Sequence, residues 1–411
     1  MRISPVGAAT LLLAAACADR AHDAPPREPA DAGWTAPGAA ETPGGATLRG
    51  SHLADLRAGP AAALHALFVT GPGGGGRPGR LLYAEFDGSR WSTPVALDET
   101  SGSIGPAQVV ADGAGRVHAF WLAGPPPASP ADPPPLTTLL YRWREGGRWS
   151  PAERLYAAPA GTPLPASGLA AARVGDAVHV IHPRLPDRFA DLVFTGTGRV
   201  LLPAGRSGGE PRLEAGPDGT LALADLKSTL SALAAPGTVF HTDPWVRVFR
   251  GRRWSEPVLV DATPGQDSHK PQVAWSRDGA LHVVWLEADP GELLPTHLFH
   301  SRSDDGRTWS PAVEPAAAAP GRVFYSPRLA LDGGRTLHLT FTRFADGLSG
   351  PRHFHLSLRG GRWSPPREIL PGPGLRGAEM ETAADARGVL HALWIGPGGD
   401  PVHAALPPAP R

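Results

Sequence analysis

The chain has 411 residues, in which 39 lysines and arginines balance 39 aspartates and glutamates. This balance excludes the strong overall field that attracts nucleic acid, and we expect no nucleic-acid partner. Glycine (51 residues) and proline (48) are abundant, but 12 tryptophans and many alternating apolar runs favour a folded, turn-rich all-β protein over a disordered one.

The N-terminus predicts export. Arg2 precedes an apolar run that ends at Ala16 and is too short to span a membrane, and Cys17 follows as the only cysteine. Small residues that end at a cysteine resemble the signal of bacterial lipoproteins. The resemblance implies a signal peptide at 1–16 and a lipid on Cys17, whereas an ordinary secretory signal is the alternative. With no second thiol, an internal disulfide and a cysteine-based metal site are excluded.

Residues 17–30 are polar, rich in proline and without periodicity, so we expect them to form a tether. The tether would connect the anchor to one folded domain at 31–411. We expect the protein to be exported and held by lipid alone on the cell-surface or periplasmic side of a bacterial membrane.

Two short motifs alternate along the rest of the chain. The first contains Trp-Ser or Trp-Thr followed by proline and recurs about every 55 residues. Its copies surround Trp91, Trp149, Trp254, Trp309 and Trp363, and a degenerate copy lies at 191–205. The second motif is an apolar strand with a histidine, which is alanine in one copy. Its copies surround His65, His118, His179, Ala222, His282, His338 and His391.

Each unit contains four short alternating segments separated by glycine turns, which predicts four antiparallel strands. Four strands in about 55 residues are typical of a β-propeller blade. The histidine-type strands favour seven blades, and six blades are the alternative. The last unit lacks an outer strand, and Trp34 lies in the frame of the first motif. We therefore expect residues 31–40 to supply that strand and close the ring.

The recurrent histidines and tryptophans are expected to be architectural. Because one histidine occurs per blade, these residues lie around a ring and do not converge on a metal ion. A tryptophan ring can be buried between two blades while its indole N–H needs one partner.

Residues 302–311 read RSDDGRTWSP and contain Asp304, Gly306, Thr308 and Trp309. Together with the inner-strand motif, they resemble the Asp-box repeat of the sialidase superfamily, although the leading serine of that box is missing. The resemblance implies a structural turn on the face opposite the pocket. We expect Asp304 to accept backbone hydrogen bonds in its own turn and to take no part in catalysis.

A sialidase also implies three arginines that grip a carboxylate, and a tyrosine nucleophile paired with a glutamate. The early Arg-Ile-Pro motif of that family is absent from the start of the mature chain. If the resemblance extends to activity, the sugar would be held by Arg184, Arg328 and Arg343. The covalent chemistry would then use Tyr325 with Glu379 or Glu381.

Polar residues in the loops outside the repeat are the other candidates for a site, since the scaffold does not require them. An alternative interpretation is that they are solvated loop charges. Beyond the arginines above, the candidate ligand-binding residues are Arg188, Lys227, Asp267, His269, Lys270 and Arg322.

We therefore expect an exported, lipid-anchored propeller that is monomeric and binds a glycan or a peptide at the mouth of its central channel. A sialidase-like glycoside hydrolase is the first alternative, and a structural partner in the cell envelope is the second. The sequence has neither a phosphate-binding glycine loop nor an acidic calcium loop, so no cofactor and no metal are expected.

Overall fold

The computed structural model describes residues 33–35, 38–39, 48 and most of 51–408. The longest internal stretches outside the described residues are 40–47, 71–78, 127–134, 230–240 and 370–378. The predicted signal peptide, Cys17 and the tether also lie outside them. Within the described chain, no helix is long and apolar enough to cross a membrane.

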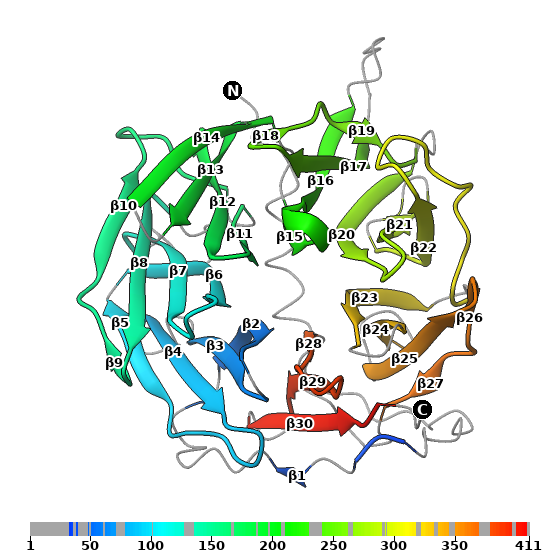
Figure 1. Cartoon of the computed structure of the whole chain (residues 1–411), viewed down its shortest axis with the longest axis horizontal. Coiled ribbons are helices and arrows are strands. Elements are labelled where there is room, and N and C mark those ends of the chain that lie inside the picture. Colours follow the sequence, from blue (N-terminus) through cyan, green and yellow to red (C-terminus); the bar gives the residue numbers. More distant parts are fainter. Residues whose placement is uncertain are drawn as a thin grey trace.

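Seven antiparallel sheets surround a central axis, so the predicted seven-bladed all-β propeller is confirmed (Figure 1). The innermost strands are β2 (Ser51–Ala58), β6 (Ser103–Ala111), β11 (Ala170–Val174), β15 (Arg212–Ala215), β20 (Asp267–Trp275), β23 (Val323–Leu331) and β28 (Met380–Ala384). The second strands are β3 (Leu64–Thr70), β7 (Val117–Gly124), β12 (Ala177–Leu185), β16 (Leu221–Thr229), β21 (Leu281–Ala288), β24 (Leu337–Phe344) and β29 (Leu390–Ile395).

The third strands are β4 (Gly79–Phe86), β8 (Thr138–Glu145), β13 (Arg188–Thr195), β17 (His241–Arg250), β22 (His297–Ser303), β25 (Arg352–Arg359) and β30 (Pro401–Leu406). The outer strands are β5 (Val95–Thr100), β9 (Arg148–Trp149) with β10 (Glu153–Ala157), β14 (Gly198–Arg206), β18 (Arg253–Trp254) with β19 (Val258–Leu259), β26 (Arg362–Trp363) with β27 (Arg367–Glu368), and β1 (Gly38–Ala39). In blade 5 a single bridge between His300 and Val313 takes the place of an outer strand. One short 3-10 turn lies at Pro217–Gly219.

The two ends of the chain close the ring as expected. Gly38 and Ala39 of β1 pair with His403 and Val402 of β30. The backbone N–H of Thr35 donates to the Ala405 carbonyl at 2.8 Å, which extends the contact toward the N-terminus. The blade that begins with β28 is thus completed by the first described residues of the chain.

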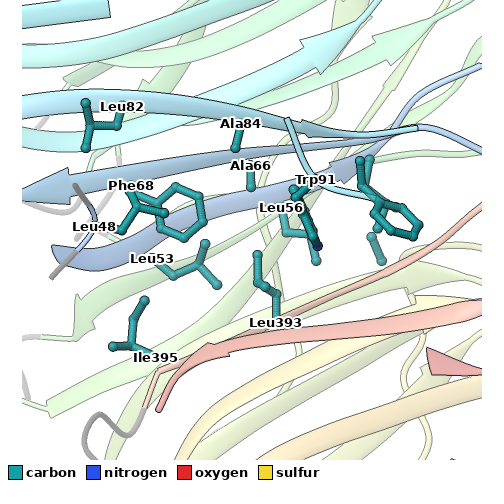
Figure 2. Packing of buried hydrophobic residues seen from close by; sticks show 13 residues of the cluster. Leu48, Leu53, Leu56, Ala66, Phe68, Leu82, Ala84, Trp91, Leu393 and Ile395 are labelled. Atoms are coloured by element: carbon teal, nitrogen blue, oxygen red, sulfur yellow. The ribbon is translucent and has the colours of Figure 1, made fainter. Parts of the chain in front are cut away.

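The apolar core lies between neighbouring blades, and Figure 2 shows the junction of blades 1 and 7. Leu53 and Phe68 of blade 1 pack in one cluster with Leu393 and Ile395 of blade 7. Because each blade buries its faces on the next blade, the stability of the ring depends on every junction.

Two faces of the ring differ in their connections. Tight turns join the first strand to the second and the third to the outer strand, and we call this side the turn face. The other side, where each innermost strand begins, is the mouth face. The hairpins at 111–117 and 145–148 are examples on the turn face.

A repeated hydrogen-bond chain explains the recurrent histidines. In blade 2, Asp112 accepts the backbone N–H groups of Ala114 and Arg116 at 2.9 and 2.8 Å. Its second oxygen lies 3.3 Å from Nε2 of His118, and Nδ1 of His118 lies 2.9 Å from the Tyr141 hydroxyl.

Blades 6 and 7 form the same chain with a second histidine in place of the tyrosine. It runs through Asp332, His338 and His355 in blade 6. In blade 7 it runs through Asp385, His391 and His403.

Two of the recurrent tryptophans donate their indole N–H to the preceding blade. Nε1 of Trp363 donates to Nδ1 of His300 in the preceding blade at 3.2 Å, and Nε1 of Trp254 donates to Asp191 at 3.1 Å. The Trp34 ring lies edge-on against His355, with 5.5 Å between ring centroids. Both recurrent residue types are therefore part of the blade junctions.

The prediction for the turn that resembles an Asp box is wrong about which aspartate binds the turn. Asp305, and not Asp304, accepts the backbone N–H groups of Arg307 and Thr308, both at 2.7 Å. Asp304 is exposed and pairs with Arg302 at 2.7 Å. The hydrogen bonds hold the pKa of Asp305 at about 2.

Asp305 binds the turn because it has the same spacing to the tryptophan as the equivalent aspartate of blade 1. Asp305 precedes Trp309 by four residues, as Asp87 precedes Trp91. Asp87 likewise accepts the N–H groups of Ser89 and Arg90, each at 2.9 Å. The box lies on the turn face, away from the mouth.

The buried histidines should make stability depend on pH. Burial lowers the pKa of His282 and His338 from 6.5 to about 4. Below pH 6.5 the unfolded chain therefore binds protons that the folded chain excludes, and stability falls as the pH falls toward 4. Between pH 7 and pH 5, each independent histidine shifted this far should cost about 2 kcal/mol of unfolding free energy.

Urea unfolding at pH 7, 6 and 5 measures this loss. His282→Gln should show a smaller loss than the unmodified chain over the same range. An unfolding free energy that is constant from pH 7 to pH 5 would contradict the buried neutral histidines.

Candidate functional site

Charged side chains of the innermost strands meet across the centre of the ring. Arg57 of β2 lies 3.7 Å from Glu214 of β15, and Arg212 of β15 lies 3.9 Å from Glu381 of β28. Figure 1 shows β15 across the ring from β2 and β28. Ion pairs therefore cross the channel at this level. We call Asp55, Arg57, Arg212, Glu214, Arg328 and Glu381 the central cluster.

The strongest pair in the central cluster is bidentate. Nε of Arg328 donates to Glu381 at 2.6 Å, and Nη2 of Arg328 contacts the second carboxylate oxygen. Burial opposes ionisation of Glu381, but Arg328 and then Arg212 outweigh it, so the pKa of Glu381 is lowered. Burial and the neighbouring Arg328 lower the pKa of Arg212 to about 10.

Asp55 links blade 1 to blade 2 as well as to the cluster. Its carboxylate accepts the Val109 backbone N–H at 2.9 Å and lies 3.2 Å from Nε of Arg57. Burial raises the pKa of Asp55 above its usual value despite the contact with Arg57. Gln108 extends the network, because its side-chain oxygen accepts from both Arg57 and the Ala171 N–H at 3.3 Å.

A second group of polar residues gathers where the innermost strands begin. The Lys270 ammonium lies 4.2 Å from the centroid of the Tyr325 ring. Glu210 accepts the backbone N–H of Lys270 at 2.7 Å, and Glu379 interacts electrostatically with both Lys270 and Tyr325. We call Glu210, Lys270, Tyr325 and Glu379 the mouth cluster. It combines residues from blades 4, 5, 6 and 7.

The backbone beside the mouth cluster is in an unusual conformation. Glu210, Lys270 and Ser326 have φ values of 59°, 48° and 49°, and each precedes a proline. Side chains other than glycine rarely adopt this left-handed region, and such strain gathers at functional sites. The strand register also shifts after His269 and after Tyr325. Blades 1 and 2 shift register at the same level, so the shift belongs to the repeat, whereas the left-handed residues before proline are found in blades 4, 5 and 6.

The protonation states of the mouth cluster follow from its charges. The Lys270 ammonium favours the phenolate of Tyr325, but burial and the negative charge of Glu379 outweigh it and raise the pKa. Tyr325 is therefore a neutral hydroxyl at pH 7. Burial disfavours the charged form of Lys270, but Tyr325, Glu210 and Glu379 together raise its pKa. The cluster thus places an ammonium, a hydroxyl and carboxylates near one another, with the Tyr325 ring itself buried against Val323 and Phe344.

The structure separates the two predicted glutamates. Glu379 lies in the mouth cluster with Tyr325, whereas Glu381 is paired with Arg328 in the central cluster. Asp267 and His269 lie on β20 beside Lys270, with 3.7 Å between them. Asp267 also accepts the Thr242 backbone N–H at 2.9 Å and so connects blades 4 and 5.

The three arginines expected to grip a carboxylate do not converge. Arg184 lies over the ring of Tyr156 at 5.0 Å, and Arg343 is buried over Phe354 at 4.2 Å. Both lie near the ends of second strands, whose side chains pack within and between blades. Only Arg328 lies on an innermost strand.

Three other candidates lie nearer the rim of the mouth face. Lys227 lies 4.3 Å from the centroid of the Trp245 ring on blade 4. Arg188 is exposed at the start of β13, and Arg322 is half-buried just before β23.

The central cluster was only partly visible in the sequence. Arg212 and Arg328 occupy the same position, directly after the proline that begins an innermost strand. That shared position could have indicated that Arg212, like Arg328, points toward the channel. Arg57 and Glu214 read as ordinary polar positions of an alternating strand, because their partners belong to blades far away in the sequence.

Among the described residues, no metal centre is part of this arrangement. Within the described residues, no group of three or more histidine, cysteine, aspartate or glutamate side chains could hold a metal ion. A cavity of about 280 Å³, lined by Glu214, Trp275 and Leu329 among others, lies toward the turn face.

Comparison with known proteins shows the fold and no family. No family model and no curated protein sequence matches the chain. A protein of unknown function from Dyadobacter fermentans is 14% identical, with a TM-score of 0.52 over 87% of this chain and 94% of that one. An ulvan lyase, described as a new family of polysaccharide lyase, is 11% identical, with a TM-score of 0.56 over 86% and 94%.

The same kind of lyase bound to a glucuronate–rhamnose-3-sulfate unit gives 10% identity and a TM-score of 0.52, again over 86% and 94%. At these identities the likeness is one of propeller fold alone. Neighbours of the fold thus include polysaccharide-acting enzymes.

The central cluster should matter for stability more than the mouth cluster does. Glu381→Gln leaves the buried Arg328 guanidinium without its bidentate partner, which should cost about 3–5 kcal/mol of unfolding free energy. Glu379→Gln, two residues earlier at the mouth, should cost less than about 1 kcal/mol. Urea unfolding of both variants at pH 7 makes the comparison. Equal losses would show that the central ion pairs are not structural.

Proposed function

We propose that this protein binds a glycan at the channel mouth through the mouth cluster. The observation that carries the proposal is the convergence of Lys270, Tyr325 and Glu379 beside strained backbone in successive blades. The ion pairs of the central cluster lie further along the innermost strands, so the ligand would rest on the mouth face. Loops placed around a rigid scaffold are the usual location of binding residues.

The chemistry of the mouth cluster fits a hydroxyl-rich ligand. Sugar hydroxyls both donate and accept hydrogen bonds, and the cluster offers the donors of Lys270 and Tyr325 beside the acceptors of Glu210 and Glu379. The ulvan lyases with this fold, one of them bound to an acidic disaccharide unit, support a glycan over a peptide. Their likeness supports the class of ligand and not the reaction.

A glycoside hydrolase of the sialidase type is the second candidate, because Tyr325 and Glu379 lie in one cluster. Two observations count against it. The raised pKa keeps Tyr325 protonated, so it is not an activated nucleophile. The arginines expected to hold the substrate carboxylate lie apart.

Binding should depend on Lys270 and Tyr325. A glycan microarray of neutral and acidic oligosaccharides identifies a ligand, and titration calorimetry measures its affinity for each variant. Lys270→Ala removes a charged donor and should weaken binding at least tenfold, and Tyr325→Phe should weaken it several-fold. Lys227→Ala serves as the control and should change the affinity less than twofold.

The absence of any bound glycan, or equal losses for Lys270→Ala and Lys227→Ala, would contradict the proposal. Release of sugar from the bound ligand by the unmodified chain but not by Tyr325→Phe would favour the hydrolase instead.

We also propose that the protein is exported and anchored through a lipid on Cys17. The motif at the N-terminus supports this, since the small residues before Cys17 follow an apolar run with a preceding arginine. In bacteria fed radiolabelled palmitate, the chain should carry label and remain with the membranes. Cys17→Ala should abolish both, and label on Cys17→Ala would contradict the anchor.

A further inference from the structure

Exposed arginines gather on the turn face of blades 4, 5 and 6. Their side chains form no ion pair or hydrogen bond with other side chains in the part of the chain that the structure describes. We call them the turn-face patch: Arg250, Arg252 and Arg253 of blade 4, Arg277 and Arg307 of blade 5, and Arg359 and Arg362 of blade 6.

The acidic residues of the same turns are largely occupied elsewhere. Asp278 and Asp304 pair with Arg302, at 3.2 and 2.7 Å, and Asp305 accepts hydrogen bonds within its own turn. Asp332 is buried against His338, and Asp218 is exposed. These five aspartates keep their charges, but the seven arginines of the patch together with Arg302 outnumber them, so this part of the turn face is net positive.

The repeat itself shows that the scaffold does not require these arginines. In blade 2, Glu145 stands opposite Arg148 in the turn Glu-Gly-Gly-Arg, which places opposite charges together. In the equivalent turn of blade 6, Arg359 stands opposite Arg362. Like charges directly opposite one another are unfavourable in a sheet.

Blade 4 repeats the arrangement of blade 6, with Arg250 opposite Arg253. An anionic surface placed against both turns would attract all four arginines and so offset the repulsion within each pair.

A hollow lies within the patch. A cavity of about 520 Å³ is lined by Arg277, Arg302 and the turn at Gly360 and Gly361, together with Asp278 and other residues. Its position between blades 5 and 6 places guanidinium groups around a space that a phosphate-bearing headgroup could enter.

The N-terminal segment joins the ring on the same face as the turn-face patch. β30 runs toward the turn face, and Thr35 pairs with Ala405 near its end. The N-terminal segment therefore joins the ring at the turn face. A lipid on Cys17 would therefore tether the ring from its turn face, the side that carries the patch.

We propose that the turn-face patch docks on the anionic phospholipid headgroups of the membrane. This contact goes beyond the lipid anchor and beyond glycan binding, and it leaves the mouth cluster open to the medium. A basic side chain near an anionic bilayer adds about 1 kcal/mol, or about a fivefold gain in partition, and the effect is screened by salt.

Vesicle co-sedimentation tests the contact without the anchor. The mature chain from residue 17 carries Cys17→Ser, so no lipid is attached, and is mixed with phosphatidylcholine vesicles with or without 30% phosphatidylglycerol. We expect binding to the anionic vesicles only, and loss of that binding in 500 mM salt. The double variant Arg250→Glu and Arg359→Glu copies the turn of blade 2 and should bind at least tenfold more weakly.

A matched control reverses two exposed arginines away from the patch, Arg154 and Arg188, and should bind as the unmodified chain does. Circular dichroism checks that both double variants are folded. If the first is not, Arg252→Ala with Arg277→Ala replaces it.

Equal binding to neutral vesicles, an equal loss in the control, or full binding by the folded patch variant would overturn the proposal. Binding that millimolar inorganic phosphate abolishes at constant ionic strength would assign the patch to free phosphate and would overturn the membrane contact.

Discussion

The structure depends on the contact between each blade and the next. A four-stranded blade has two faces to bury, and it buries them only on its neighbours. In blade 6, hydrogen bonds lead from the turn aspartate Asp332 through His338 of the second strand to His355 of the third, and Trp34 of the following blade packs on His355. Because the ring is closed, the last junction, between blades 7 and 1, is as necessary as the others, and the first described residues complete blade 7 and pack through Trp34 on blade 6.

This scaffold leaves the innermost strands free to vary. The recurrent histidines and tryptophans lie on the second and outer strands, so the repeated hydrogen-bond chains do not include the polar side chains near the axis, of which Asp55 and Asp267 link neighbouring blades by contacts of their own. The chain uses that freedom in two ways: the central cluster binds opposite blades together, and the mouth cluster lies where the strands begin. Departures from the repeat are therefore more informative about function than its best preserved copy, the turn at Asp305.

The sequence predicted the ring and its closure because both rest on local, repeated patterns. The predictions of individual residue roles failed where a role depends on the exact position within one turn or on contacts between blades that are distant in the sequence. Asp304 fits the spacing of a known box, yet Asp305 stands at the right distance from Trp309 to bind the turn. Arg184 and Arg343 look like free loop charges but lie at strand ends against aromatic rings. Tyr325 and Lys270 were both candidates, although only folding could show that they touch.

The N-terminal segment relates the closure of the ring to the position of the tether. The residues that complete the seventh blade also fix where a tether leaves the ring, since Thr35 lies beside the end of β30. An anchor attached to this segment would tether the propeller from its turn face. On this argument the patch of arginines and the mouth cluster are complementary: the first would hold the face that the tether reaches, and the second would meet ligands on the opposite face. One strand pairing at the seam of the ring thus closes the fold and places the first described residues at the turn face.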